Sequence, residues 1–298
     1  MFITSQWLKK NVRMEYLSPD EISQKWAELQ ENGFTSVAGV LDKEFVEELK
    51  QWSKAIIKEN PPDEEFAYQG SDIHIFTEER WSRRVHLKLG PTRMPDPMAA
   101  KIIFNQKKLA ICKELGFEGL TPQEWVILIS KPPRSPPCYW HQDYMNWNSP
   151  EAFTPWPTKL LIGFYLSDTK KENGCMRVIS GSHQNHHQLH DKVPPPHEEE
   201  IKKITDLNHP TYAPHPDAVD VNVAAGDMIL VDARLLHGTW GNSSQLPRTL
   251  FVIWHDVFSK AAPSWWRDSL PKEMEGFDRL IEYEKTKIPT RFVSNPLQ

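Results

Sequence analysis

The order of helix-like and strand-like segments constrains the fold of this chain more than any other feature of its sequence. Helical periodicity is confined to about the first 120 residues, and the rest is rich in β-branched and aromatic runs. Helices followed by many short strands favour an antiparallel sandwich or barrel over alternating strands and helices. We therefore predict a mainly β fold with flanking helices, whose strands are Trp125–Ile129, Lys159–Leu166, Cys175–Ile179, Val219–Val223, Asp227–Val231 and Arg248–Val257.

The N-terminal part carries two clear helix starts. Ser18 is followed by Pro19 and Glu21, the pattern of a capping box with proline in the first turn, and Gly33 is placed to end that helix. Asp42 is placed to cap a second helix, in which apolar residues recur at helical spacing: Phe45, Val46, Leu49, Trp52 and Ile56. We expect both helices to be scaffold.

Three further segments have less regular patterns. Asn60–Arg93 lacks a stable period and is predicted to be loop with short strands, whereas Pro97–Gly116 is predicted to be one helix. His190–Pro216 contains Pro194-Pro195-Pro196, and we interpret it as a long solvated insertion or lid.

The length and composition indicate one folded domain. A chain of 298 residues with 39% hydrophobic and 25% charged residues can bury one large core. We expect a single domain over residues 1–298, made of a helical part (about 1–120), a β core (about 121–258) and a C-terminal extension (259–298).

Charge and cysteine content exclude several classes of partner. The net charge of −5 gives no basic surface for nucleic acid or anionic membrane. Cys112, Cys138 and Cys175 have no paired spacing, which is typical of a reduced intracellular protein. No apolar stretch reaches transmembrane length, and the first apolar run is too short for a signal peptide. We therefore expect a cytoplasmic protein; the sequence leaves its oligomeric state open.

His141-Gln142-Asp143 is the strongest candidate for a metal site. It follows a predicted strand, and in an extended strand His141 and Asp143 share a face. His237 follows far downstream. Two histidines and one carboxylate on one side of a metal leave positions open for a cosubstrate and O2, as in non-haem iron oxygenases. A closed structural zinc site has four protein ligands and no open position.

Two other patterns compete with this metal site. His215-Pro216-Asp217 has the same spacing but lies in a proline-rich loop, where neither strand alternation nor rigid support is expected, so we rank it far lower as the iron site. A second run has spacing that would line one helix face and could bind zinc: His183, His186, His187 and His190. It lacks the glutamate of metalloprotease motifs, and a solvated polar helix is the simpler interpretation.

His237-Gly238-Thr239 and Arg248 are candidates for binding a carboxylate. Residues 240–247 have the composition of a hairpin connection, so an antiparallel return could bring Arg248 alongside Thr239. Arginine grips a carboxylate through two parallel N–H bonds, and a threonine hydroxyl can add a third. A dicarboxylic cosubstrate such as 2-oxoglutarate needs such a grip at the end that does not chelate iron. The alternative is a surface arginine at a strand start.

Aromatic and polar residues downstream of Asp143 are candidates for the substrate cleft. Large flat side chains exclude water and hold apolar or cationic substrates. Because the chain has 12 Trp, most of them must belong to the core. The candidates for substrate contact are Tyr144, Asn146, Trp147 and Trp156. Arg177 and His74 are weaker candidates. Lys88 and Lys131 could assist in binding an anion, but long lysines are usually solvated.

The chain resembles the phytanoyl-CoA dioxygenase family of iron and 2-oxoglutarate oxygenases. The resemblance rests on Trp140-His141-Gln142-Asp143, Glu172-Asn173-Gly174-Cys175-Met176-Arg177-Val178-Ile179-Ser180-Gly181-Ser182-His183, Ala225-Gly226-Asp227, and His237-Gly238-Thr239 with Arg248. It implies a double-stranded β-helix (a cupin-like jelly roll) with the iron ligands His141, Asp143 and His237. It also implies that Arg248 and Thr239 bind the 2-oxoglutarate carboxylate. Ser180 is a departure, since the family usually has proline there.

The resulting hypothesis is an Fe(II)- and 2-oxoglutarate-dependent dioxygenase. Such an enzyme hydroxylates, desaturates or ring-closes a substrate while 2-oxoglutarate and O2 yield succinate and CO2. We expect a small metabolite or natural-product intermediate as substrate, since no basic cluster suits the phosphates of coenzyme A. The alternatives are a non-redox jelly roll that binds metal or carbohydrate and a cupin-type oxygenase that needs no 2-oxoglutarate.

Overall fold

A computed structural model describes residues 15–59, 71–76, 79–82, 88–91, 97–117, 121–122, 125–143, 157, 159–194 and 199–256. Within these residues every strand pair is antiparallel. The larger of two sheets has nine strands, in the order β1 (Phe34–Val37), β11 (Met228–Asp232), β8 (Lys159–Tyr165), β13 (Arg248–Asp256), β6 (Trp125–Lys131), β2 (Ser71–Phe76), β3 (Glu79–Ser82) and β4 (Lys88–Pro91), with β5 (Thr121–Pro122) beside β13.

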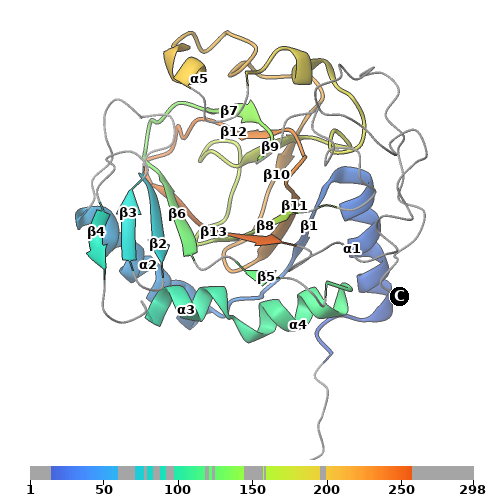
Figure 1. Ribbon diagram of the computed structural model, residues 1–298, viewed down its shortest axis with the longest axis vertical. Helices are drawn as coiled ribbons and strands as arrows, with labels where there is room; N and C mark the ends of the chain where they lie inside the picture. The colour runs from blue at the N-terminus through green and yellow to red at the C-terminus, as the bar shows by residue number, and fades with distance from the viewer. Residues whose placement is uncertain are drawn as a thin grey trace, which may run out of the picture.

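The smaller sheet faces the larger one (Figure 1). Its order is β10 (Ala218–Val221), β9 (Met176–Ile179), β12 (His237–Thr239) and β7 (Cys138–His141). Alternate residues of both sheets meet in one buried cluster, which includes Met176, Val178, Ile229, Leu250 and Val252. Burial of this apolar surface holds the sheets together as a jelly roll. All six predicted strands are present, with ends that differ by two residues at most.

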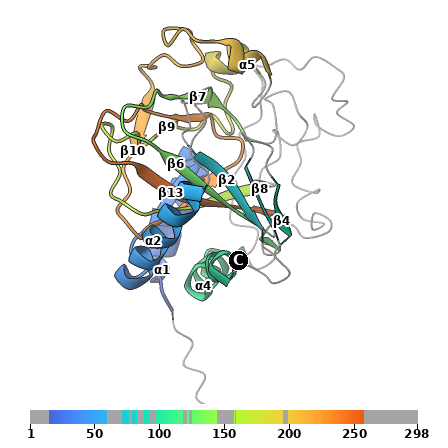
Figure 2. The same ribbon diagram turned by 90° about the vertical axis from the view of Figure 1, so that its left-hand side faces the viewer.

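Helices cover the outer face of the larger sheet (Figures 1 and 2). They are α1 (Pro19–Asn32), α2 (Lys43–Glu59), α3 (Pro97–Ile103) and α4 (Gln106–Glu114). One continuous core joins them to β6, β8, β11 and β13, and Trp52 of α2 stacks on Phe251 at 5.4 Å between ring centres. Among the described residues no helix combines the length and hydropathy needed to cross a membrane.

The predicted caps of α1 and α2 are confirmed. Ser18 N–H donates to Glu21 Oε2 at 2.8 Å, Glu21 N–H donates to Ser18 Oγ at 3.3 Å, and Gly33 ends the helix at φ 82°. Phe45 N–H donates to Asp42 Oδ1 at 2.7 Å. These bonds satisfy amides that a helix start leaves unpaired.

The single helix predicted over Pro97–Gly116 is wrong, because two helices occupy this stretch. The break falls at Asn105, whose side chain accepts the N–H of Lys108 at 2.9 Å and thereby caps α4. An asparagine side chain competes with the backbone for hydrogen bonds, so it favours a new helix start over continuation.

The helix predicted over His183–His190 is also wrong. His187 has φ −128° and ψ 146°, an extended conformation, and it caps the short 3-10 helix η3 (Gln188–Asp191). An extended residue cannot continue a helix, so the four histidines do not line one face. Beyond η3, the predicted insertion carries α5 (Glu199–Lys203) and returns to β10.

His183 should make the fold sensitive to acid. Its ring is 0% exposed and its Nε2 lies 3.1 Å from the carbonyl oxygen of Gln30. Burial lowers the pKa of His183 to about 4, while the carboxylate of Asp232 raises it and the guanidinium of Arg234 lowers it. Below about pH 6.5 the unfolded chain therefore binds a proton that the folded chain does not bind until about pH 4.

The contribution of His183 to stability is complete above pH 6.5 and is lost as the pH falls toward 4. The expected loss is about 3 kcal/mol of unfolding free energy. Urea unfolding at pH 7 and pH 4.5 measures it, and a His183→Gln variant should show a flatter dependence. A variant with the same slope as the wild type would assign the acid sensitivity to other groups.

Candidate metal centre and active site

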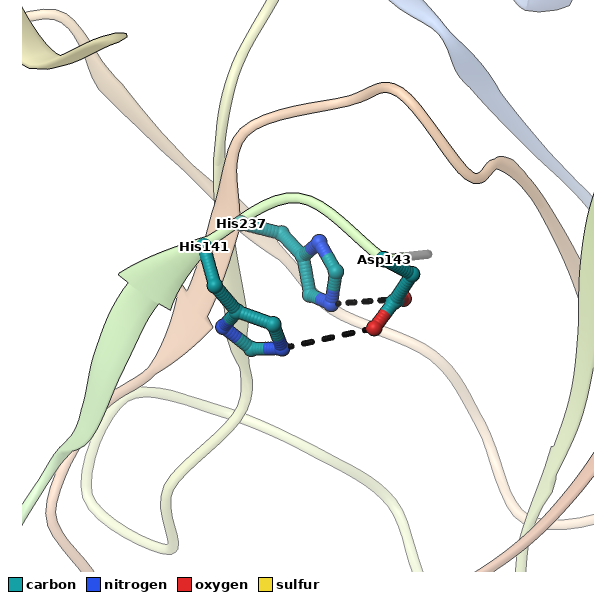
Figure 3. Close-up of side chains that lie close together, drawn as sticks. All are labelled: His141, Asp143 and His237. Atoms are coloured by element: carbon teal, nitrogen blue, oxygen red, sulfur yellow. Dashed lines mark ion pairs between the residues drawn. The ribbon is translucent and has the colours of Figure 1, made fainter. Parts of the chain in front are cut away.

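His141, Asp143 and His237 meet inside the described fold (Figure 3). His141 ends β7, and His237 begins β12 directly opposite it in the pairing register. Asp143 Oδ1 lies 3.6 Å from His141 Nε2, and Asp143 Oδ2 lies 3.3 Å from His237 Nε2. All three residues are buried, with exposures of 7%, 5% and 6% for His141, Asp143 and His237. The sequence motif and the distant histidine thus form one cluster of three potential ligands.

Each imidazole is oriented by the backbone carbonyl of the residue two positions before it. Nδ1 of His141 lies 3.0 Å from the carbonyl oxygen of Tyr139, and Nδ1 of His237 lies 2.9 Å from that of Leu235. A carbonyl can only accept, so each Nδ1 carries a proton, and in the neutral ring Nε2 is then the nitrogen whose lone pair can bind a metal. Figure 3 shows both Nε2 atoms turned toward Asp143. Metal-binding histidines are held by this kind of outer hydrogen bond.

Asp143 lies beyond the end of β7 and not within an extended strand as predicted. The chain bends there, and the N–H of Asp143 donates to Ala233 O at 2.8 Å. The amide of Gln142 donates to the carbonyl of Arg234, whose guanidinium is paired with Asp232 at 2.6 Å. The carboxylate therefore reaches the histidines because the loop after β11 holds this bend.

Gly238 permits the close approach of β12 to β7. A Cβ atom there would lie 2.8 Å from Tyr139 O and 3.0 Å from Cys138 O, and both are backbone atoms that cannot swing aside. Any side chain would push β12 away from β7 and carry His237 with it. A glycine is needed here for space.

Gly238→Ala is expected to weaken Fe(II) binding by roughly 10-fold or more, an effect of the size seen when metal ligands lose their support. Metal titration followed by calorimetry measures it. Gly39→Ala is the control: its φ of 60° makes alanine unfavourable for the backbone, but a Cβ there meets nothing within 4 Å and Gly39 is not part of β12, so metal affinity should not change. Equal metal affinity in the two variants would show that β12 tolerates the displacement.

Arg248 reaches the interior from the opposite sheet. The hairpin predicted between His237 and Arg248 is wrong, since β12 pairs with β7 and β9 whereas β13 pairs with β6 and β8. Residues 240–247 cross from the smaller sheet to the larger. By strand alternation Arg248 shares a face with Leu250 and Val252, which lie in the core between the sheets.

The guanidinium of Arg248 is buried without an acidic partner. Arg248 is 2% exposed, its Nε has no hydrogen-bond partner, and within the described ranges no carboxylate forms an ion pair with it. Its Cζ lies 5.6 Å from the ring centre of Tyr165. Buried charges are normally paired, so this cation fits an anionic ligand that the described residues do not supply.

The charges of the cluster and of Arg248 act on the same buried thiol. Burial raises the pKa of Cys138, the cations Lys131, Arg177 and Arg248 oppose this rise, and Asp143 adds to it. Cys138 is paired with Thr239 in the register, and its N–H donates to Thr239 Oγ1 at 3.3 Å. That bond leaves the hydroxyl proton of Thr239 free to donate elsewhere.

Arg177 lies on the other face of the smaller sheet. Its neighbours Met176 and Val178 point into the core between the sheets, so alternation turns Arg177 outward. Its guanidinium stacks between Trp140 and Trp240, 4.4 and 4.7 Å from the ring centres. It donates to three carbonyls, those of Cys138, Tyr212 and Ala213. These contacts make Arg177 a structural tether of the insertion.

The other predicted substrate residues, Tyr144, Asn146, Trp147 and Trp156, lie outside the described residues. Lys131 lies in the interior beside Arg248, although lysines are usually solvated. It is 1% exposed, it pairs with Arg248 in the register, and its Nζ donates to Pro136 O at 2.6 Å. The alternation Ile127, Ile129, Lys131 was the available signal, because it places the lysine on the inner face of β6.

Known proteins with similar sequences are oxygenases. The chain is 25% identical over 126 residues to an ectoine dioxygenase of Nocardia farcinica, a match that covers 40% of this chain and 42% of that protein. The match therefore spans about two fifths of that relative's length.

Solved structures support the jelly-roll fold. SnoN from nogalamycin biosynthesis, in complex with Fe3+, alpha ketoglutarate and nogalamycin RO, matches with a TM-score of 0.54 and 20% identity over 89% of this chain and 95% of SnoN. HygX from Streptomyces hygroscopicus, with nickel and 2-oxoglutarate bound, matches with a TM-score of 0.56 and 17% identity over 80% and 87%. The predicted double-stranded β-helix is confirmed.

A protein-family model matches most of the chain. The model described as phytanoyl-CoA dioxygenase (PhyH) matches residues 29–250, a range that starts in α1 and ends in β13. It includes the three clustered residues and Arg248. On this evidence the chain belongs to the phytanoyl-CoA dioxygenase family.

Proposed function

We propose that this protein is an Fe(II)- and 2-oxoglutarate-dependent dioxygenase that oxidises a small molecule. The observation that carries the proposal is the presence, inside one fold, of a buried His-Asp-His cluster and a buried arginine that pairs with no carboxylate of the described residues. The first suits a metal with open positions, and the second suits the far end of a dicarboxylic acid. A non-redox metal site would give no reason to bury Arg248.

In this proposal His141, Asp143 and His237 hold the iron, and Arg248 with Thr239 holds the remote carboxylate of 2-oxoglutarate. Bound Fe(II) supplies the activation of O2 that couples cosubstrate decarboxylation to substrate oxidation. The protein contributes orientation and exclusion of water. The carbonyls of Tyr139 and Leu235 fix the two imidazoles in the protonation state that binds metal. Apolar residues of both sheets keep bulk solvent from the interior.

The expected substrate is a small metabolite or a natural-product intermediate. Proteins similar to this chain include an ectoine dioxygenase and HygX, whose structure has been solved with hygromycin B bound, and both are compatible with a small polar substrate here. We further propose one catalytic domain for residues 1–298, because one core cluster joins the described N-terminal helices to the larger sheet. The three cysteines of the chain are buried and form no disulfide, which suits the cytoplasm.

A succinate-release screen tests the proposal. Protein loaded anaerobically with Fe(II) is given 2-oxoglutarate, O2 and panels of amino acids, terpenoids, alkaloids and acyl thioesters, and succinate is measured by mass spectrometry. The expected result is substrate-dependent succinate that disappears without 2-oxoglutarate. Tight zinc retention with no succinate would favour a non-redox jelly roll, and oxidised product without succinate would favour a cupin-type oxygenase.

A further inference from the structure

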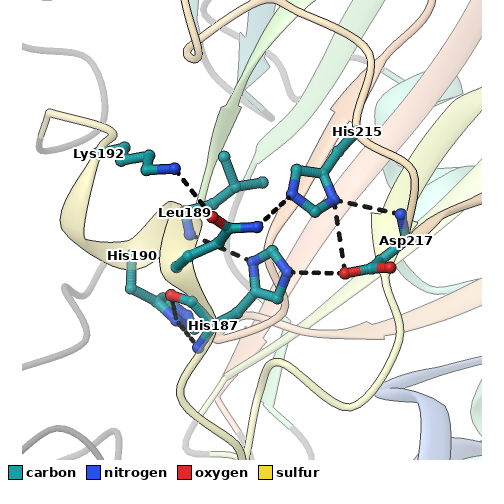
Figure 4. A network of polar contacts seen from close by, with 7 residues as sticks. His187, Leu189, His190, Lys192, His215 and Asp217 are labelled. Carbon is teal, nitrogen blue, oxygen red and sulfur yellow. Dashed lines mark hydrogen bonds and ion pairs between the residues drawn. The ribbon is translucent and has the colours of Figure 1, made fainter.

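A second group of possible metal ligands lies on the insertion between β9 and β10 (Figure 4). His187 caps η3, and His215 and Asp217 precede β10. His187 Nε2 lies 3.3 Å from Asp217 Oδ2, and His215 Nδ1 lies 3.7 Å from the same oxygen. The two rings meet edge to face at 4.7 Å. Two sequence patterns that each look weak alone thus combine into one group.

We propose that His187, His215 and Asp217 form a second metal site, selective for Zn2+-like ions and separate from the proposed iron centre. Ligand atoms at roughly 2.0–2.1 Å from a tetrahedral zinc are about 3.3 Å apart, so the two separations need little adjustment. Imidazole and carboxylate are ordinary zinc ligands, and water can complete the tetrahedron. The side chain of Asp217 is 64% exposed, so an ion can enter the site from solvent.

The groups around the His187 and His215 rings favour zinc binding, but binding also requires two weak hydrogen bonds to be given up. Partial burial, His187 and Lys192 lower the pKa of His215 while Asp217 raises it, and the net lowering favours the neutral ring that binds metal. Asp217 N–H donates to His215 Nδ1 at 3.2 Å, and Leu189 N–H donates to His187 Nδ1 at 3.2 Å. Zinc at His215 Nδ1 replaces the first of these long bonds. Zinc at His187 Nε2 displaces the ring proton to Nδ1 and breaks the second.

The site would join the two ends of the insertion. His187 lies at the start of the segment and His215 at its end, with α5 between them. The returning part of the segment covers the outer face of the smaller sheet, where Tyr212 O and Ala213 O accept bonds from Arg177. The inner face of that sheet carries His141 and His237. A zinc ion would therefore stiffen a layer that backs the proposed iron centre, without taking part in chemistry.

Zinc stoichiometry tests the proposal independently of any oxygenase activity. Protein freed of metal is dialysed against buffered Zn2+, and bound zinc is measured by mass spectrometry. The wild type should hold two equivalents, whereas His215→Ala and Asp217→Asn should each hold one. His186→Ala is the matched control and should hold two, because His186 pairs with Asp191 and is not one of the three grouped ligands. Asp217→Asn changes an exposed side chain, so it should fold normally and still test the site if His215→Ala misfolds.

Hydrogen exchange provides a second readout. Zinc should slow amide exchange across residues 188–217 in the wild type and in His141→Ala, but not in Asp217→Asn. One zinc equivalent in the wild type that His141→Ala removes, or two equivalents in Asp217→Asn, would overturn the second site. One equivalent that persists in His141→Ala and is lost in Asp217→Asn would support it. The iron proposal is tested separately by the succinate screen.

Discussion

His141→Ala is expected to abolish succinate formation and to weaken Fe(II) binding by more than about 100-fold. The ring supplies one of three buried donors, and loss of a ligand should exceed the roughly 10- to 100-fold loss caused by removing an outer partner. Anaerobic titration with Fe(II) and 2-oxoglutarate measures binding through the weak visible charge-transfer band that the wild-type protein should develop.

His209→Ala is the control for this experiment. His209 lies on the insertion and its ring contacts Thr211, so its loss changes a histidine without touching the cluster. The control should keep the wild-type band. A wild-type protein without the band, or an undiminished band in His141→Ala, would reject the assignment of the iron ligands.

Arg248→Ala should lower the affinity for 2-oxoglutarate by about 2 to 5 kcal/mol, the cost of removing one partner of a buried charge pair. This corresponds to roughly 30- to 5000-fold in dissociation constant. Fe(II) affinity should change little, because Arg248 is not among the clustered ligands. Calorimetric titration of the metal-loaded protein with 2-oxoglutarate measures the loss.

Two controls make the Arg248 result specific. Arg248→Lys keeps the charge but cannot form two parallel N–H bonds, so it should fall between the wild type and the alanine variant. Without ligand, Arg248→Ala should unfold no more easily than the wild type, since it removes a buried cation that has no acidic partner. Unchanged 2-oxoglutarate affinity in Arg248→Ala would rule out the proposed carboxylate site.

Local patterns were sufficient to predict much of the fold. The strands, the capping box at Ser18 and the cap at Asp42 depend on residues only a few positions apart, and the structure confirms them. The sequence predicted a strand before His141, at Trp125–Ile129, but it did not predict β7, the strand that ends at His141. The resemblance to a known family supplied the partner His237 and the jelly roll, which no local pattern contains.

Most of the wrong predictions concern features that depend on contacts between residues far apart in the sequence. Composition marked residues 240–247 as a connection but could not show that it crosses between sheets, because sheet membership depends on long-range packing. The extended backbone of His187 and the meeting of His187 with His215 likewise arise from the return of the insertion. The side-chain cap at Asn105 was visible in the sequence, yet it competed with a continuous helical pattern.

The ligands on β7 and β12 belong to strands whose paired residues Cys138 and Thr239 are 101 positions apart. In the unfolded chain these side chains are therefore far apart, and only the folded jelly roll brings them together. Any ion that selects the assembled form stabilises it by mass action, by about 2.7 kcal/mol when free metal is 100 times its dissociation constant. If the proposed iron centre is correct, Fe(II) should therefore raise the unfolding free energy of this protein as well as support its oxidation chemistry.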